Sequence, residues 1–268
     1  MLTLLTTSGM QVPNWVALEQ AAEAAAMDYL YNKAFIKHTQ RLLSPPNSNT
    51  KLSKGKGLPI YGLTLAPAGL SGYQVCPNRS AECERACLGV TAGRSRFSNV
   101  VAARIKKTKF LMEDPYSFFR NLFHELELAH KLHHGQFALR SNVLSDIPWE
   151  NIAPYMYRFA DKNYDYTKNL ERALQSLEPK APVALTLSYS GRNWDDCYQY
   201  LSKGGNVAMV FNTKRHQGLP QFITHENQEY CVVDGDIDDR RYADPRGCIV
   251  GLRAKGNIDM SSRFVVNI

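Results

Sequence analysis

The sequence predicts an α/β protein: a partial (βα) barrel with mainly parallel strands and a helical N-terminal extension. From residue 60 onward, short apolar runs alternate with segments of helical period. The runs are continuously apolar, which is typical of parallel strands covered on both faces. Six or seven such units in about 200 residues fit a partial barrel better than a doubly wound sheet. We therefore expect residues 58–268 to form a barrel-like domain on which residues 1–57 pack as a helical extension.

Helices are predicted where this periodicity coincides with start and stop signals. Asp114 and Pro115 form the best start, an N-cap followed by proline in the first turn, and Gly135 is a stop. An Ala-rich stretch with apolar residues four apart predicts the N-terminal helix, and Ser98 predicts another cap. The expected helices cover residues 14–44, 98–112 and 114–134, a segment opening at 145–148, a segment ending at 177, and residues 194–201. In the helix after Asp114 we expect these residues to face inward: Phe119, Leu122, Phe123, Leu126 and Ala129.

The apolar runs between these helices predict the strands. In parallel α/β folds the carboxyl ends of the strands form the edge where ligands bind, so the residues that follow each run are the candidates for function. The expected strands are residues 60–65, 137–144, 164–167, 182–188, 206–211, 229–233 and 248–252.

The most informative feature is a loop with three cysteines, Cys76, Cys83 and Cys87, directly after the first expected strand. The spacing is C-x6-C-x3-C, and the second and third cysteines are one helical turn apart. The residues between them are polar, so the thiols are poor candidates for apolar filler. Three converging thiolates suit a soft metal or an iron–sulfur cluster, whereas a disulfide would leave one thiol unpaired. Structural or redox thiols remain the alternative.

Composition sets limits on the class of protein. The chain has 268 residues, 44% hydrophobic and 21% charged, with a net charge of +7. No segment reaches the roughly 20 apolar residues that cross a bilayer, and the first residues do not predict a signal peptide. Six cysteines, three of them scattered, do not indicate a secreted disulfide framework, so we expect a reducing cytoplasm. The basic run at residues 85–109 fits a solvated helix face, and the alternatives are a nucleic acid, a phosphate or an anionic cluster beside it.

Polar residues follow the later strands in the same way. Asp146 follows the second, Lys168 follows the third, and Ser188 ends the fourth, so these three are the candidate catalytic residues. Loops are polar in any protein, and Ser145 or Asp146 could equally cap the next helix. Together, such residues would line one rim that faces the cysteine loop.

Other chemistries lack a motif. In the acidic run at residues 234–239 the glycine falls second rather than sixth, so the run fails the EF-hand pattern. It instead predicts a polar loop that pairs with Arg240, Arg241 or Arg246. The sequence has no zincin motif, phosphate-binding loop, dinucleotide fingerprint or nucleophile elbow.

Zinc and an iron–sulfur cluster make different demands on the cysteine loop. Structural zinc usually takes four ligands in two close pairs, and this chain offers no such pair. A [4Fe-4S] cluster held by Cys76, Cys83 and Cys87 would keep one iron open for a substrate, and this is the interpretation we favour. Cys197 is the protein candidate for the fourth ligand, but it shares a helix face with Trp194 and Leu201, so it equally predicts a core residue.

The three-cysteine loop after the first strand of a partial barrel resembles the layout of the radical S-adenosylmethionine enzymes. Those enzymes usually carry C-x3-C-x2-C, and Ser145-Asp146 stands where many of them hold the methionine amine on a Gly-Gly-Glu stretch. The resemblance implies a cluster and leaves binding of S-adenosylmethionine open.

A closer resemblance is to a bacteriophage family known as the gene-eighty-eight protein, over roughly residues 58 to 257. Within that resemblance the three cysteines are the cluster ligands, and the host cell's cytoplasm is the expected location. The residues that carry the likeness are Cys76-Pro77, Cys83, Cys87-Leu88, Arg104, Lys107-Thr108, Arg140, Ser145-Asp146, Tyr166-Thr167-Lys168, Asp234-Gly235-Asp236 and Lys255-Gly256.

The predicted function is therefore that of a phage-type iron–sulfur protein with radical or redox chemistry on a small molecule or nucleotide, and without a membrane partner. The alternative is a non-enzymatic protein in which zinc or a cluster staples a basic surface that binds nucleic acid. A third class, an inhibitor of a host factor, has no positive signal in the sequence.

Overall fold

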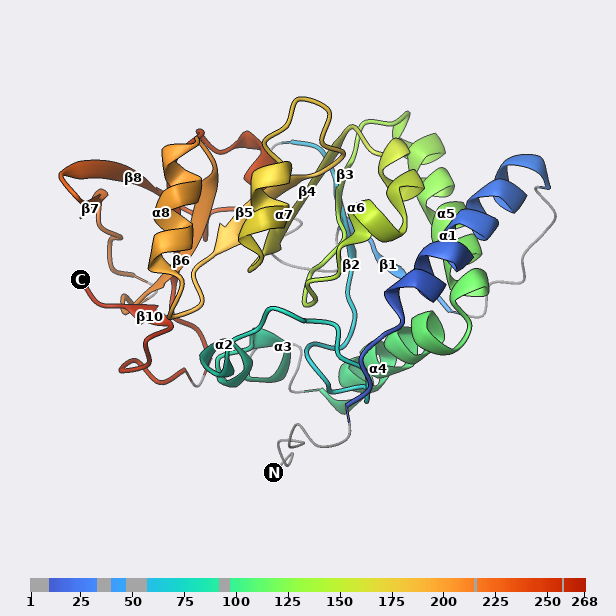
Figure 1. Ribbon diagram of the computed structural model, residues 1–268, viewed down its shortest axis with the longest axis horizontal. Helices are drawn as coiled ribbons and strands as arrows, with labels where there is room; N and C mark the ends of the chain where they lie inside the picture. Colours follow the sequence, from blue (N-terminus) through green and yellow to red (C-terminus); the bar gives the residue numbers. More distant parts are fainter. Residues whose placement is uncertain (1–9, 33–39, 47–56, 92–96, 215, 257) are drawn as a thin grey trace. The chain divides into compact units, whose positions relative to one another are not determined.

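The computed structural model describes residues 10–32, 40–46, 57–91, 97–214, 216–256 and 258–268 (Figure 1). The chain divides into two compact units, each assembled from separate segments. Unit 1 comprises residues 1–48, 58–77 and 97–163, and unit 2 comprises residues 49–57, 78–96 and 164–268. Both units combine helices with strands, and the strands of unit 2 are mostly parallel, which confirms the α/β class. The predicted division at residue 57 stays a prediction.

The strands of unit 1 are β1 (Leu43–Ser44), β2 (Ile60–Leu63) and β3 (Ala138–Arg140). β2 and β3 run parallel, and β1 pairs with β2 in the antiparallel sense. The carboxyl ends of β2 and β3 lead into loops that remain hydrogen-bonded to each other, since the Val143 amide donates to the Leu63 carbonyl at 3.1 Å.

The helices of unit 1 are α1 (Trp15–Tyr31), α4 (Ser98–Glu113), α5 (Pro115–His133), α6 (Trp149–Ile152) and the 3-10 helix η3 (Pro154–Arg158). α1 packs along α5 (Figure 1). The start of α5 is as predicted, because the Asp114 carboxylate accepts the Ser117 amide at 3.2 Å. His134 and Gly135 both adopt left-handed φ angles, so the helix ends where the glycine predicted. All the residues of α5 expected to face inward are buried.

Two of the helix predictions in unit 1 are wrong. The helix expected over residues 14–44 ends at Tyr31, and Leu43 lies in β1. The amides of Leu42 and Leu43 both donate to the Glu125 carboxylate at 2.7 Å, a contact across more than 80 residues that holds this segment extended. The cap of α4 is Phe97, without a side-chain hydrogen bond, and Ser98 is already the first helical residue. Residues 33–39 of the predicted helix lie outside the described chain.

The strands of unit 2 form one row in the order β4-β5-β6-β9-β8-β7. They are parallel except for β7, which forms an antiparallel hairpin with β8. β10 runs parallel to the end of β6, beyond the part of β6 that pairs with β5. The first two residues of β4 belong to unit 1. The bounds are β4 (Lys162–Thr167), β5 (Ala184–Ser188), β6 (Asn206–Phe211), β7 (Phe222–His225), β8 (Gln228–Asp234), β9 (Ile249–Arg253) and β10 (Val265–Val266).

In the described part of unit 2, no pairing joins β4 to β7, so this row of strands is open. The parallel pairings of β4, β5, β6, β9 and β8 confirm the predicted mainly parallel sheet. Its curvature into a partial barrel stays a prediction.

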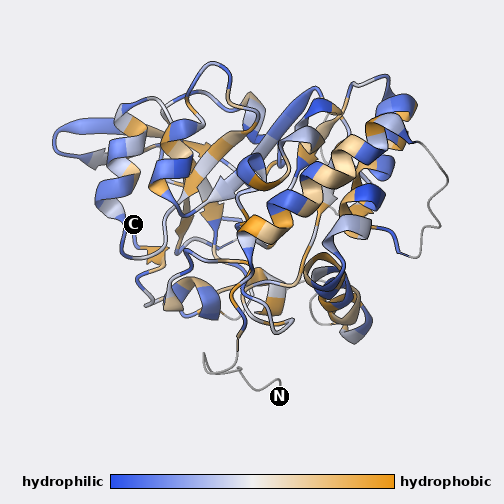
Figure 2. Ribbon diagram, turned by 45° about the vertical axis from the view of Figure 1, so that its right-hand side comes forward, coloured by the Kyte–Doolittle hydropathy of each residue, from blue (hydrophilic) through white to orange (hydrophobic). Residues whose placement is uncertain are grey.

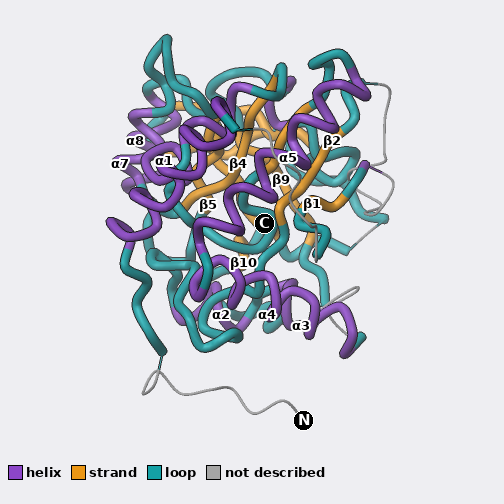
Figure 3. Tube along the Cα trace, turned by 90° about the vertical axis from the view of Figure 1, so that its right-hand side faces the viewer, coloured by secondary structure: helices purple, strands orange, loops and turns teal. Residues whose placement is uncertain are grey.

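The helices of unit 2 are α2 (Ala81–Arg85), α3 (Leu88–Thr91), α7 (Leu170–Gln175), α8 (Trp194–Ser202) and the 3-10 helix η4 (Arg241–Ala243). α7 and α8 lie side by side against β5 and β6 (Figures 1 and 3). Their buried side chains form a core with β5, β6 and β9, while the tip of the β7–β8 hairpin is hydrophilic (Figure 2). The opposite face of the row buries Ala208, Cys248 and Val250.

No helix in the described ranges is long and apolar enough to cross a membrane.

Candidate functional site

Cys76, the first thiol of the loop, lies at the carboxyl ends of β2 and β3 in unit 1. Its sulfur donates to the Leu144 carbonyl at 3.6 Å, and Leu144 belongs to the loop that follows β3. The Ala68 amide donates to the same sulfur at 3.3 Å. Ala68 has a φ of +47°, a left-handed conformation that is unusual for a residue with a side chain. An N–H group directed at a cysteine sulfur is a contact that also occurs at the ligands of iron–sulfur clusters, so the surroundings of Cys76 are compatible with a metal ligand.

The loop after β3 is held by one buried amide. The Asn142 side-chain oxygen accepts hydrogen bonds from the Ser145 hydroxyl at 2.8 Å, the Ile147 amide at 3.0 Å and the Trp149 indole at 3.1 Å. The Asp146 amide donates to the Val75 carbonyl at 2.9 Å, next to Cys76. Asp146 therefore lies at the edge predicted for it, and its side chain is buried.

The prediction that Ser145 or Asp146 caps the next helix is wrong. The cap of α6 is Pro148, and it makes no side-chain hydrogen bond. Instead, the Ser145 hydroxyl and the Ile147 amide both donate to the Asn142 side chain. The local sequence pattern does not predict these hydrogen bonds.

The other two thiols belong to unit 2. Cys83 is in α2, and Cys87 lies two residues beyond its end. The Ser80 hydroxyl accepts the Cys83 amide at 3.0 Å and donates to the Ser190 carbonyl at 2.7 Å. Ser190 lies in the loop after β5, so α2 is attached to the carboxyl end of that parallel strand.

An ion pair reinforces this attachment. Arg192, in the same loop, contacts the Glu82 carboxylate at 2.8 Å. A hydrogen bond within Glu82 itself, from its backbone, and the guanidinium of Arg192 lower the pKa of this carboxyl group. Glu82 therefore remains ionised beside Cys83.

Lys168 and Ser188 lie side by side at the same edge of unit 2. β4 and β5 pair with Thr167 opposite Leu187, and the two candidate residues follow these partners directly. The structure thus brings together, within unit 2, Lys168, Ser188 and the helix that carries Cys83. Cys76 and Asp146 are brought together within unit 1.

The donor set fits a thiolate-bound group. All six cysteines are free, and Cys76, Cys83 and Cys87 are each half-buried rather than packed in a core. In the ranges that the structure describes, no three His, Cys, Asp or Glu side chains stand grouped as a metal site. The suitability of the loop thus rests on the chemistry of its thiols and on the amide directed at Cys76.

Cys197, the alternative fourth ligand, is a core residue. Its side chain is 0% exposed and packs with Leu187, Leu201 and Met209. Burial raises the pKa of this thiol to about 12, so it stays protonated at neutral pH.

The acidic run that begins at the end of β8 pairs with arginines. Asp238 contacts Arg240 at 2.7 Å, which is one of the predicted pairings, whereas Asp234 contacts Arg253 at 2.9 Å, an arginine outside the prediction. These carboxylates are used within the fold.

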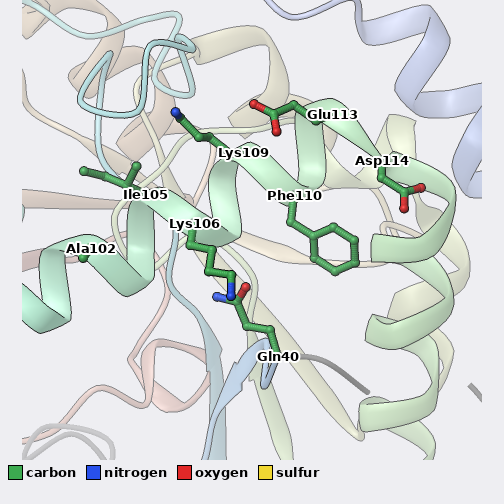
Figure 4. Close-up of a pocket in the computed structure, with 8 residues that line it drawn as sticks. All are labelled: Gln40, Ala102, Ile105, Lys106, Lys109, Phe110, Glu113 and Asp114. Carbon is green, nitrogen blue, oxygen red and sulfur yellow. The ribbon is translucent and has the colours of Figure 1, made fainter. Parts of the chain in front are cut away.

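Unit 1 also contains a cavity of about 520 Å³ beside α4 (Figure 4). Lys106 and Phe110 extend to the same side of α4, Lys106 toward Gln40, whereas Lys109 extends to the other side (Figure 4). The residues that line the cavity are Gln40, Ala102, Ile105, Lys106, Lys109, Phe110, Glu113 and Asp114.

Sequence reasoning passed over the residues that hold the thiols: Asn142, Ser80 and Asn193. A usable signal existed for Ser80, because a serine three residues before Cys83 is a typical N-cap. Asn142 and Asn193 gave no such signal, since their partners are set by the fold.

Fold and site together describe an α/β protein with a thiol-bearing loop attached to the carboxyl ends of parallel strands in each unit. The family model of gene product 88 matches residues 37–268, so the chain belongs to this bacteriophage family. The resemblance read from the motifs is thereby confirmed. No curated protein and no solved structure matches the chain, and nothing supports the likeness to radical S-adenosylmethionine enzymes.

Proposed function

We propose that the protein is an iron–sulfur protein whose [4Fe-4S] cluster is held by Cys76, Cys83 and Cys87. The supporting observation is that each end of this loop is hydrogen-bonded to a loop that follows a parallel strand, through Leu144 in unit 1 and Ser190 in unit 2. These are the positions where α/β proteins bind their ligands. When bound, such a cluster supplies one-electron chemistry, and its fourth iron can bind a small molecule.

In this proposal the remaining polar residues bind and orient the substrate. Lys168 supplies a cation and Ser188 a hydroxyl at the carboxyl ends of β4 and β5, and Asp146 supplies a carboxylate beside Cys76. Lys168 and Ser188, which adjoin within unit 2, suit a small molecule or nucleotide with an anionic group. The free thiols fit the reducing cytoplasm of an infected host cell, where we propose that the protein acts.

The test is anaerobic purification followed by reconstitution with iron and sulfide. We expect brown protein with absorbance near about 400 nm and about four irons per chain. Replacing Cys76, Cys83 or Cys87 by alanine should remove the iron and the absorbance. Cys231→Ala is the matched control, because Cys231 is an exposed thiol outside the loop. Full occupancy after the loss of any of the three loop thiols would refute the proposal.

A second candidate is a nucleic-acid-binding protein in which the same loop holds zinc or a structural cluster. The observations in its favour are the net charge of +7 and the exposed Lys106 and Lys109 on α4. Colourless protein with stoichiometric zinc, and DNA affinity that falls steeply with salt, would support it. Absence of DNA binding at low salt would reject it.

A further inference from the structure

The helix that carries Cys83 is too short to be stable by itself. α2 spans five residues, and its turn is closed by hydrogen bonds such as that from the Glu84 amide to the Ser80 carbonyl at 3.0 Å. Helices shorter than about 12 residues are marginal in water because the first turn is costly to nucleate. Contacts with the rest of unit 2 must therefore hold α2 in place.

One such contact is a continuous chain of hydrogen bonds from the end of β5 to the Cys83 amide. The Asn193 side chain donates to the Ser188 carbonyl at 3.3 Å, and its oxygen accepts from the Ser190 amide at 2.7 Å and the Ser190 hydroxyl at 2.9 Å. The Ser190 carbonyl then accepts from the Ser80 hydroxyl, which also accepts the Cys83 amide. A single oxygen atom thus caps α2 and fastens it to the loop.

The second contact is the ion pair between Glu82 and Arg192. The Glu82 side chain is only 9% exposed, whereas that of Arg192 is 65% exposed. Arg85 is also near Glu82, but its distance is 3.8 Å and its side chain is 67% exposed. Removal of Arg192 would leave the buried Glu82 carboxylate without its close partner, a larger loss than removal of Arg85, which lies 1 Å farther away.

The loop that receives these contacts is itself fixed. Gly191 has a φ of +92°, and a Cβ atom there would stand 3.0 Å from the Phe264 amide nitrogen. A side chain at this position would be strained and would clash with backbone. The backbone path between Ser190 and Arg192 is therefore fixed by the left-handed conformation of Gly191 and by the backbone of Phe264 beside it.

We propose that Ser80 and Arg192 are positioning residues, which hold Cys83 and Cys87 against the loop after β5 before any metal or cluster is bound. The inference rests on the proposed function only for the role given to the two thiols. Whether protein contacts hold α2 in place without metal can be measured on the metal-free chain.

The first experiment compares hydrogen exchange of the metal-free full-length chain with that of Arg192→Gln and of Arg85→Gln. We expect roughly fivefold faster exchange of the amides of residues 83–87 in Arg192→Gln, from loss of a charge-assisted hydrogen bond. Arg85→Gln is the matched control, because it removes a neighbouring cation from the same carboxylate, and Arg192→Lys should restore part of the protection. Equal exchange in Arg192→Gln and the parent chain would overturn the inference.

A second pair of variants separates the two hydrogen bonds of the Ser80 hydroxyl, the one that caps α2 at Cys83 and the one that attaches α2 to Ser190. Ser80→Thr keeps a hydroxyl that can accept from Cys83 and donate to Ser190, so its exchange should match the parent. Ser80→Asp keeps the acceptor for the Cys83 amide but has no hydrogen to donate to the Ser190 carbonyl. If Ser80→Asp protects residues 83–87 as well as serine does, capping alone suffices and the positioning role of Ser80 is refuted.

The same variants are then loaded anaerobically with iron and sulfide, and the rate at which a chelator removes the iron is followed by absorbance. We expect iron to leave Arg192→Gln several-fold faster than Arg85→Gln, because two of its ligands are less well held. If even the parent takes up no iron, the proposed function fails, while the exchange data still decide the inference. If the parent takes up iron and Arg192→Gln matches it in exchange, the inference is overturned and the proposed function stands.

Discussion

The loop after β3 in unit 1 and the loop after β5 in unit 2 are built around the same device, an asparagine side chain that accepts the loop's own donors. Asn142 accepts three hydrogen bonds and donates a fourth to the Ile147 carbonyl at 2.9 Å. Asn193 accepts two and donates one. The chemistry is the same, but Asn142 is 3% exposed whereas Asn193 is partly exposed.

The difference teaches how burial changes the importance of one amide. Around Asn142, water cannot replace a lost partner, so the loop depends on this side chain. Asn193 is partly exposed and has fewer partners, and the loop after β5 is also held by the Arg192–Glu82 ion pair. In unit 1 the loop beside Cys76 is thus held by one buried side chain, that of Asn142. In unit 2 the segment with Cys83 is held by several partly exposed contacts.

The largest expected effect is that of Asn142→Ala. The change leaves the Ile147 amide, the Trp149 indole and the Ser145 hydroxyl without their acceptor in a buried region. We expect the free energy of unfolding to fall by about 3 kcal/mol, because each unsatisfied buried donor costs about 1–3 kcal/mol. Urea unfolding measures the change. A loss no larger than that of a surface substitution would contradict the role given to burial.

A second, intermediate effect tests burial in the interior of unit 2. Desolvation raises the pKa of Asp244 from its ordinary value of 3.8 to about 6, against the opposing effect of Arg241, which lies 3.2 Å away. A carboxyl group with a raised pKa binds more protons in the folded chain than in the unfolded chain. Its favourable contribution is therefore complete below about pH 4 and is lost as the pH rises through about 6.

Asp244→Asn removes this titration. Relative to the parent, the variant should gain about 2 kcal/mol of unfolding free energy between pH 4 and pH 7. Urea unfolding at the two pH values gives the difference, and Asp161→Asn is the control, since Asp161 is half-exposed. A constant difference between variant and parent across this range would show that Asp244 is not desolvated.

The smallest effect is expected for Asn193→Ala. Only two donors, the Ser190 amide and hydroxyl, lose their acceptor, and Asn193 itself is partly exposed, so we expect a smaller loss of about 1 kcal/mol in urea unfolding. If Asn193→Ala destabilises the chain as much as Asn142→Ala does, the contrast between the two loops is wrong.

Elements with local signals could be predicted from the sequence. The start of α5 at Asp114-Pro115, its end near Gly135 and its buried face follow from capping rules and period alone. The bounds of β6 were also correct, at Asn206–Phe211, because a continuous apolar run between helices has few other uses.

The secondary-structure predictions fail where contacts with residues distant in the sequence determine the local structure. Leu43 falls inside the helix predicted over residues 14–44, yet the Glu125 carboxylate accepts its amide and that of Leu42. β9 lies between β6 and β8, an order that chain sequence does not specify. The β7–β8 hairpin was missed because its turn is Glu226-Asn227, both with positive φ, rather than a glycine-containing pair. In the candidate site, the thiols and Asp146 stood out by residue type, whereas Asn142 and Arg192 act through contacts that only the fold creates.

The left-handed backbone at Ala68 has a consequence for sequence variation in this family. The amide that reaches Cys76 is aimed by a φ of +47°, and Ala68 is also buried, so the position has little room and an unusual conformation. Glycine would adopt this conformation without strain, whereas a β-branched residue would be costly there. Position 68 should therefore tolerate very few amino acids although it carries no reactive group. Relatives that place valine or isoleucine there would have to bring an amide to the sulfur along a different backbone path.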